Sequence, residues 1–352
     1  MAIVCQNLPE PCQHGPVPAP RRRATITSVA EAAGVAPSTV SRAFTNPGRV
    51  NHRTREHVLA VAERLGYAPN PMAQALESGR TNTVALVVPD ITNPYFSGVV
   101  KGAERAAAEA RLTLVIGDAQ ENPTHEERLV RRLGPAVDGF VLTASRMPDD
   151  ALQRVSELNR IVLVNRTSPG LTSVVADFAA GTRQIVAHLA SHGHRSFVFL
   201  GGPAESWSGA RRWAGLRTAA DEHGLEATRF GPFTPTTASG PAAADAVLTT
   251  RATAVVAHND VLAIGVLQRL AERGVRVPEQ LSVVGFDDVF GADFCHPPLT
   301  TLAERTTEAG TRAVEALAAL TRPGAAPTGE DAPVRVLPTQ LVLRASSGPA
   351  PT

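Results

Sequence analysis

The sequence predicts a small all-α head followed by a larger α/β body, and three observations point to this fold class. Between residues 25 and 78, apolar residues recur at three- and four-residue steps, as in short amphipathic helices. After Gly79 the chain carries short, valine-rich apolar runs, most of which end at Gly, Asp or Asn. Segments with helical period separate these runs, which is typical of a parallel sheet covered on both faces.

Residues 1–23, "MAIVCQNLPEPCQHGPVPAPRRR", precede the head. Their prolines and lack of periodicity predict a disordered arm that ends in Arg21, Arg22 and Arg23. Such an arm suits contact with phosphate, although a solvated leader or an extension from a misplaced start codon fits the same composition. No apolar stretch of about 7–15 residues follows a basic start, so we expect no secretory signal.

Charge is unevenly distributed along the chain. Residues 1–80 contain nine arginines and five glutamates, a net charge of +4, whereas the remainder has a net charge of −3. A basic head on a mildly acidic body indicates that the head binds an anion.

No run approaches about 18 uncharged apolar residues, so we expect no membrane span. Cys5, Cys12 and Cys295 lack metal-ligand spacing, which favours free thiols in a reducing, cytoplasmic compartment.

The segment "TITSVAEAAGVAPSTVSRAF" predicts a helix-turn-helix. We expect a first helix at about 26–33, a left-handed turn at Gly34, and a second helix whose first residue is Pro37. The residues expected to pack the helices together are Val29, Ala33, Val35 and Val40. The residues left outside are Ser38, Thr39, Ser41 and Arg42. Small hydroxyl groups let a helix enter the major groove, and a guanidinium fits guanine or phosphate. A small helical bundle with a polar face is the alternative interpretation.

The expected strands of the body are "TVALVVPD", "LTLVIGD", "GFVLTA", "IVLVN", "SVVAD", "FVFLGG", "TAVVAH" and "LSVVGFDD". They could form one large sheet or two smaller ones. Ligands of parallel sheets bind at the carboxyl ends of the strands, which draws attention to Asp90, Asn165, Asn259 and Asp287. Residues 322–333 look like a loop, residues 334–344 predict a last strand or two, and the end looks like a short polar tail.

The segment "ATITSVAEAAGVAPSTVSRAFTNPGRVNHRTREHVLAVAERLGYAPNPMAQALESGRTNTVALVVPDITNPYF" resembles the N-terminal signature of the lac-repressor (LacI/GalR) family of bacterial transcription regulators. The resemblance continues through "DGFVL", "GTRQIVAHLASHGHR", "HNDVLAIGVLQRLAERGVRVPEQLSVVGFDD" and "PPLTT", and it covers roughly residues 24–345. It implies an all-α helix-turn-helix head with a hinge helix, and an α/β body of two parallel-sheet sub-domains like a periplasmic sugar-binding protein.

The resemblance also implies domain boundaries. We expect the helix-turn-helix domain at 24–69, the hinge helix at 70–80, the effector-binding body at 81–345 and a tail at 346–352. Within the body, the first sub-domain would comprise about 81–177 and 302–325, and the second about 178–301 and 333–345. The chain would cross between them near 175–180, 300–303 and 325–333.

The family pattern assigns DNA contacts to matching positions. Pro37, Ser38 and Arg42 would face the bases, and the residues that would hold phosphate or reach groove edges are Thr25, Thr39, Thr45 and Arg49. The hinge positions are Asn70, Ala73 and Leu76, with Leu76 as a wedge in the minor groove that bends the DNA. A buried packing leucine is the alternative for Leu76. Pro71, which opens the hinge helix, and Glu77, which adds negative charge near DNA, depart slightly from the pattern.

The same resemblance implies an effector site in the cleft of the body. Its expected residues are Asp90, Tyr95, Phe96, Asn165, Arg166, Trp207, Arg212, Asn259 and Asp287. Aspartate, asparagine and arginine at strand ends suit bidentate binding of vicinal hydroxyls, so a carbohydrate is favoured over a purine. Structural hydrogen bonding at strand ends is the alternative for each residue.

Other classes of protein fit the sequence less well. "HLASHGH" groups His188, His192 and His194, but no cysteine or carboxylate completes a zinc site. Asp287 and Asp288 could form an acid–base pair, but adjacent side chains at a strand end diverge, and "LGGP" lacks the Lys-Ser/Thr of a phosphate-binding loop. We therefore expect no enzyme activity, no metal and no cofactor. A transport solute-binding protein and a DNA-bending protein without a ligand remain alternatives.

These observations predict a cytoplasmic, nucleoid-associated homodimer that binds a near-palindromic operator, because a two-fold protein needs a two-fold site. Ligand in the cleft would move the sub-domains and decide whether the hinge helices stay folded. Repression is the usual outcome in the family and is our expectation here.

Overall fold

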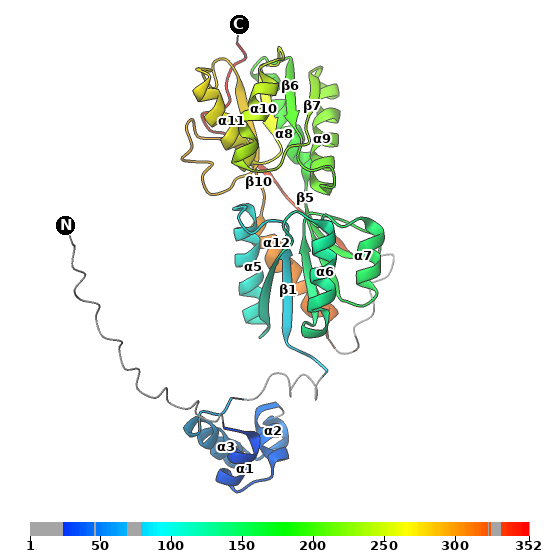
Figure 1. The fold of residues 1–352 in the computed structure, drawn as a ribbon, viewed down its shortest axis with the longest axis vertical. Coiled ribbons are helices and arrows are strands. Elements are labelled where there is room, and N and C mark those ends of the chain that lie inside the picture. The colour runs from blue at the N-terminus through cyan, green and yellow to red at the C-terminus, as the bar shows by residue number, and fades with distance from the viewer. Residues whose placement is uncertain (1–23, 46, 69–78, 323, 325–331, 352) are drawn as a thin grey trace, which may run out of the picture. The chain divides into compact units, whose positions relative to one another are not determined.

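The computed structural model describes residues 24–45, 47–68, 79–322, 324 and 332–351. The chain divides into two compact units, Met1–Gly79 and Arg80–Thr352, and each is described by itself (Figure 1). The arm at 1–23 and the hinge positions Asn70, Ala73 and Leu76 lie outside the described residues. Among the described residues, no helix is both long and apolar enough to span a bilayer.

The described part of the head contains three α-helices and one short 3-10 helix. These are α1 (Ile26–Ala33), α2 (Pro37–Thr45), η1 (Pro47–Arg49) and α3 (His52–Arg64). Thr25 and Ser28 form a capping box, in which each backbone N–H donates to the other side-chain oxygen. Gly34 ends α1 with a φ of 65°, as the turn requires. The head core, which includes the expected Val29, Ala33 and Val40, is Val29, Ala30, Ala33, Val40, Ala43, Val58, Val61 and Ala62.

The first sub-domain of the body is a six-stranded parallel sheet of order β11-β5-β4-β3-β1-β2. Its strands are β1 (Thr83–Val88), β2 (Thr113–Asp118), β3 (Gly139–Thr143), β4 (Ile161–Val164), β5 (Thr172–Ala176) and β11 (Val334–Leu337). Its helices are α5 (Tyr95–Glu109), α6 (Pro123–Leu133), η2 (Gly134–Ala136), α7 (Asp149–Ser156) and α12 (Thr306–Leu320).

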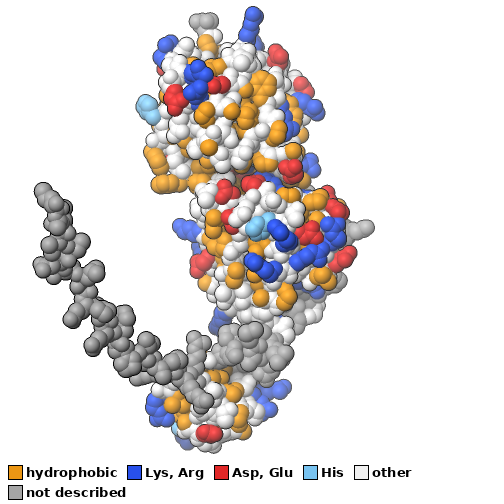
Figure 2. Space-filling model, viewed as in Figure 1, with side chains coloured by type: hydrophobic (Ala, Val, Ile, Leu, Met, Phe, Trp, Pro, Cys, Tyr) orange, Lys and Arg blue, Asp and Glu red, His pale blue; other side chains and the backbone are white. Residues whose placement is uncertain are grey.

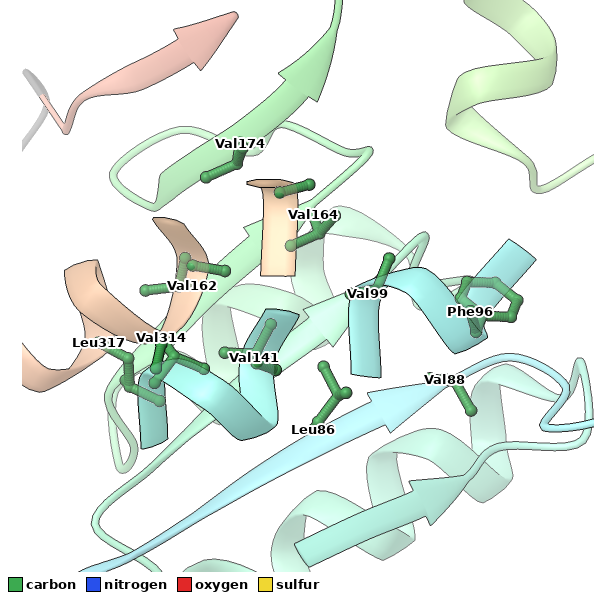
Figure 3. Packing of buried hydrophobic residues seen from close by; sticks show 14 of the residues in the cluster. Leu86, Val88, Phe96, Val99, Val141, Val162, Val164, Val174, Val314 and Leu317 are labelled. Carbon is green, nitrogen blue, oxygen red and sulfur yellow. The ribbon is translucent and has the colours of Figure 1, made fainter. Parts of the chain in front are cut away.

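Alternate side chains along the strands of this sheet enter two different cores. One core packs the sheet against α5 and α12, and Figure 3 shows sheet residues such as Val141 and Val162 meeting Val314 and Leu317. The other core packs the opposite face against α6 and α7. Burial on both faces explains why the strands read as continuous apolar runs.

The second sub-domain is also six-stranded, of order β12-β10-β9-β8-β6-β7, and only β12 runs antiparallel to its neighbour. Its strands are β6 (Ser196–Leu200), β7 (Glu226–Phe230), β8 (Ala254–Ala257), β9 (Ser282–Asp287), β10 (Thr300–Ala303) and β12 (Gln340–Val342). Its helices are α8 (Phe178–Ser191), α9 (Trp207–His223), η3 (Thr237–Ser239), α10 (Gly240–Val247) and α11 (Asp260–Glu272). The body therefore contains two sheets rather than one large sheet.

The chain crosses between the two sheets three times, and two crossings differ from the expected positions. The first lies near Asp177, between β5 of one sheet and α8. The second follows β10 at Glu304, because β10 pairs with β9 as far as Ala303. The third follows β11, because residues 334–337 pair with β5 in the first sheet, so assigning all of 333–345 to the second sub-domain was wrong. Sheet membership of a short edge strand depends on distant partners rather than on its own residues.

The expected polar tail at 346–352 is part of the second sub-domain. The Ser346 hydroxyl is fully buried, donates to the carbonyl oxygen of Val283 at 2.6 Å and accepts from the N–H of Thr300 at 2.8 Å. The N–H of Ala350 donates to the carbonyl oxygen of His192 at 2.8 Å. His194 is also fully buried, with one ring nitrogen 2.8 Å from the hydroxyl of Thr253.

Candidate functional site

Helix α2 of the head has one packed side and one exposed side. Val40 and Ala43 are buried in the head core. Pro37, Ser38 and Arg42 are exposed. Thr39 and Ser41 lie partly buried between the two sides. The side predicted to face bases is therefore open to a partner.

The other expected DNA contacts of the head have mixed surroundings. Arg49 is exposed at the end of η1. Thr25 is exposed, but its hydroxyl already accepts the N–H of Ser28 at 3.2 Å as the cap of α1. The side chain of Thr45 lies outside the described residues. The described part of the head, residues 24–68, carries five arginines and three glutamates, and Figure 2 shows arginine side chains on its visible face. Such a surface suits a phosphate backbone.

The body contains a small polar cavity of about 30 Å³ at the carboxyl ends of strands from both sheets. Six of the nine expected effector residues line it: Tyr95, Phe96, Asn165, Arg212, Asn259 and Asp287. The other lining residues are Asn93, Glu121, Ala144, Arg146, Ser208, Pro235 and His258. Parallel strands that end at one edge bring these side chains together from distant parts of the sequence.

Arg212 lies at the centre of a buried charge network and is only 4% exposed. Its guanidinium donates to Asp287 at 2.7 Å, to Glu304 at 2.8 Å and to the carbonyl oxygen of His258 at 2.5 Å. Burial acts against the charge, but Asp287 and Glu304 raise the pKa of Arg212 above its ordinary value. Burial also raises the pKa of Asp287 well above its usual range, against the attraction of Arg212. Two carboxylates thus share one cation.

Glu304, at the second crossing, connects this network to the first sub-domain. Its Oε2 accepts from the hydroxyl of Tyr95 at 3.0 Å and from the amide of Asn165 at 2.8 Å. The Asn165 amide also donates to the Tyr95 hydroxyl. Asn165 and Asp287 have φ values of 51° and 107°, and non-glycine residues in this region cost about 1–3 kcal/mol each. Such strain at two strand ends is typical of a functional site.

A second ion pair lies across the cavity, where Arg146 donates to Glu121 at 2.7 and 3.1 Å. His258 is buried beside Arg212, and burial, followed by that cation, lowers the pKa of His258 well below its ordinary value. Nη1 of Arg146, Nε of Arg212 and Nδ1 of His258 are buried without a hydrogen-bond partner among the described residues. Buried polar atoms are nearly always paired, so these three atoms call for a partner such as a ligand or a bound water molecule.

Three expected effector residues do not line this cavity. Asp90 accepts from the N–H and hydroxyl of Thr92 at 2.8 and 2.7 Å, which forms a local turn. Arg166 is buried and donates to Ser145 and Asp149. Trp207 lines a different cavity, with the guanidinium carbon of Arg211 5.0 Å from its ring centre.

The sequence reasoning missed Glu121, Arg146, His258 and Glu304. Glu121 and Arg146 follow β2 and β3, so the rule of polar residues after strand ends could have found them. His258 stands in the quoted "HND" stretch beside Asn259. Glu304 follows a strand at a crossing between sub-domains, and its importance appears only in three dimensions.

Comparison with known proteins agrees with both units. Residues 25–70 match the family described as bacterial regulatory proteins, lacI family, and residues 186–347 match the periplasmic binding protein-like domain. The chain is 33% identical over 345 residues to the HTH-type transcriptional regulator DegA of Bacillus subtilis (strain 168), covering 94% of this chain and 100% of that protein.

Solved structures show the same architecture. The Lac repressor dimer bound to operator and the anti-inducer ONPF matches with a TM-score of 0.81 and 27% identity, covering 93% of this chain and 100% of that chain. The complex of the transcriptional regulator CelR with cellobiose matches with a TM-score of 0.68 and 30% identity, covering 92% of this chain and 100% of that chain. The resemblance read from the sequence is confirmed: the chain belongs to the lacI family of bacterial regulatory proteins, which are DNA-binding transcriptional regulators.

Proposed function

We propose that this protein represses transcription as a homodimer on a near-palindromic operator, and that a sugar bound in the polar cavity controls its affinity for DNA. The observation that carries the sugar assignment is the set of three unpaired, buried nitrogen atoms on Arg146, Arg212 and His258. They lie in one cavity with amide and carboxylate groups and with two aromatic rings, Tyr95 and Phe96.

Charge balance favours a neutral ligand. Arg146 is paired with Glu121, and Arg212 is shared by Asp287 and Glu304. An anionic effector would therefore bring a charge for which no cation is free in the cavity, and burying an unpaired charge is costly. A polyhydroxyl ligand needs hydrogen bonds only. The cellobiose complex of CelR provides a sugar-bound relative of the same fold. A purine is the second class of ligand in the test below.

The size of the cavity suggests how the ligand acts. The cavity offers about 30 Å³ to the centres of water-sized spheres, and one water molecule needs roughly 10–15 Å³ on that measure, so the cavity as it stands is too small for a sugar. Binding would have to widen the space and rearrange the bonds through which Glu304 joins Tyr95 and Asn165 to Arg212. The ligand would thus change the relative positions of the sub-domains. A coupling free energy of about 1–3 kcal/mol would change DNA affinity roughly 5–150-fold.

In the head, we propose that Pro37, Ser38 and Arg42 contact bases, while Thr39 and Arg49 contact phosphate.

In the body, we propose that the second subunit of the homodimer covers an exposed aromatic pair. Phe290 and Phe294 are 82% and 64% exposed, with ring centres 4.9 Å apart. Exposed aromatic patches of this kind mark protein interfaces.

The test is a thermal-shift screen of the purified chain against monosaccharides, disaccharides and purine bases, followed by measurement of DNA affinity with the best ligand. We expect a sugar to raise the melting temperature and to change operator affinity. In Arg146→Gln the sugar should bind at least about tenfold more weakly, whereas the matched surface variant Arg154→Gln should bind normally. Stabilisation by a purine alone would reject the sugar, and equal binding by both variants would reject the cavity.

A further inference from the structure

A second cavity of about 440 Å³ lies at the first crossing between the sub-domains. Its lining comes from the end of β5, from Val336 of β11, from the start of α8 and from one side of α9. It shares no lining residue with the polar cavity. Its volume falls within the range of about 300–1,000 Å³ that is typical of small-molecule sites.

The walls of this cavity, which we call the hinge pocket, are apolar and include a flat aromatic face. Val175 and Phe178 are 6% and 4% exposed, and Ala219 is fully buried. Trp207 is partly exposed and also lines the pocket. Val336, which also lines the pocket, is 55% exposed, so part of the apolar lining is open to solvent.

Two cations stand at the rim of the hinge pocket. Arg183 and Arg211 are exposed, and neither makes an ion pair or a side-chain hydrogen bond with any described residue. The guanidinium carbon of Arg211 lies over one face of the Trp207 ring, 5.0 Å from its centre, so the opposite face is the one that a ligand ring can contact. The lining carboxylate, Asp177, already accepts the N–H of Ala180 at 2.9 Å as the cap of α8.

From this arrangement we propose that the hinge pocket is a second ligand site, which binds an aromatic carboxylate. The ring lies against Trp207 and Phe178, and the carboxylate is held by Arg183 and Arg211 through charge-assisted hydrogen bonds. The chemistry is opposite to that of the polar cavity, where every cation is already paired with a carboxylate. The site does not depend on the identity of the effector in the polar cavity.

The position of the hinge pocket gives its ligand a regulatory role. Val175 and Val336 belong to the first sheet, whereas Arg183 and Trp207 belong to helices of the second sub-domain. A ligand that touches both sides binds best to one relative arrangement of the sub-domains, and it stabilises that arrangement by its differential affinity. The protein therefore integrates two chemical signals.

The experiment uses 2-naphthoate as the probe and the full chain carrying Trp213→Phe. The chain contains two tryptophans, so this variant leaves Trp207 as the single tryptophan reporter. We expect saturable quenching of Trp207 fluorescence by 2-naphthoate, and at least about tenfold weaker quenching by the neutral analogue 2-naphthylmethanol. Adding Arg183→Gln and Arg211→Gln should weaken 2-naphthoate binding at least about tenfold.

Two controls make the result decisive. Arg217→Gln removes a cation from the same helix outside the pocket lining and should leave binding unchanged. Arg154→Gln removes a surface cation of α7 outside the pocket lining and should also leave naphthoate binding unchanged. Equal affinity for the acid and the alcohol, or an equal loss of binding in Arg217→Gln and in the two pocket variants, would overturn the proposal. Melting temperatures verify that each variant is folded.

Discussion

Arg42 in the head and Arg212 in the body carry the same guanidinium group in opposite environments. Arg42 is exposed on α2, and its charge faces solvent. Arg212 is 4% exposed and is held by Asp287, Glu304 and a backbone carbonyl group. An exposed cation is available to a partner at little cost to the fold. A buried cation must first be satisfied within the chain, and a ligand has to rearrange bonds that already exist.

This contrast separates the two tasks of the protein. The head presents charge outward, so its binding to DNA depends on surface side chains. The body keeps charge inside, so the proposed response to a ligand would be coupled to its stability. Four predictions test the contrast, in decreasing order of expected effect.

Arg212→Ala should lower the free energy of unfolding of the body by about 3–5 kcal/mol, because it leaves two buried carboxylates without their cation. Urea titration followed by tryptophan fluorescence reports on the body, since both tryptophans lie there. Adding Glu304→Gln should recover part of the loss. If Arg212→Ala were as stable as Arg42→Ala, the contrast between the two arginines would be wrong.

Asp260→Asn should change how stability depends on pH. Burial raises the pKa of Asp260 to about 7, while Thr301 and the N–H of Val289 oppose the rise. Between its ordinary value of 3.8 and about 7, the folded state therefore holds a proton that the unfolded state releases. The stability that this proton contributes is full at low pH and is lost as pH rises to about 7.

The free energy of unfolding of Asp260→Asn, minus that of the wild type, should therefore rise by up to about 1.4 kcal/mol per pH unit between pH 5 and 7. Above pH 7.5 this difference should stay constant. Urea titrations at several pH values measure this difference. Burial also lowers the pKa of His188 to about 4, which gives an opposite slope below pH 6.5, but both proteins share that slope. A constant difference across pH 5–7 would mean that Asp260 is ionised in the folded state.

Arg42→Ala should weaken operator binding by about 1–3 kcal/mol, or roughly 5–150-fold, as for loss of one bidentate base contact. Its unfolding free energy should change by less than about 0.5 kcal/mol because the side chain is exposed. Fluorescence anisotropy with operator and with scrambled DNA measures both affinities. Equal losses on the two DNAs would assign Arg42 to phosphate rather than to bases.

Thr25→Ala should destabilise the head alone by about 1 kcal/mol, because it removes the cap of α1. Hydrogen exchange of the α1 amides measures this local effect, and Thr25→Ser should restore protection. Protection that is unchanged in Thr25→Ala would show that the hydroxyl does not stabilise the helix and would leave DNA contact as its role.

The sequence predicted best what depends on neighbouring residues. Local rules predict the helix at 26–33, which follows Thr25, and its left-handed end at Gly34. The exposed side of α2 follows from the helical period. Polar residues after strands predicted three of the thirteen residues that line the polar cavity, namely Asn165, Asn259 and Asp287.

Position around α9 explains why the prediction that Trp207 lines the polar cavity was wrong. Ser208 and Arg212 are four residues apart on one side of the helix and line the polar cavity. Trp207 and Arg211 each precede them by one residue and line the hinge pocket instead.

Long-range pairing could not be predicted in the same way. Glu304 becomes central only because β10 ends at the crossing, beside Tyr95 and Arg212. The strand β11 has exposed Val334 and Val336, and its own residues do not indicate which sheet it joins. Both facts depend on contacts between segments more than ninety residues apart.

The late position of β11 has a consequence for synthesis of the protein. The buried core of the head ends at Ala62, whereas the first sub-domain needs α12 and β11, which end at Leu320 and Leu337. A ribosome that adds about 5–20 residues per second needs roughly 15–50 s to translate from the end of the head to β11. During that interval the DNA-binding head can fold, while the body that we propose to control it is incomplete.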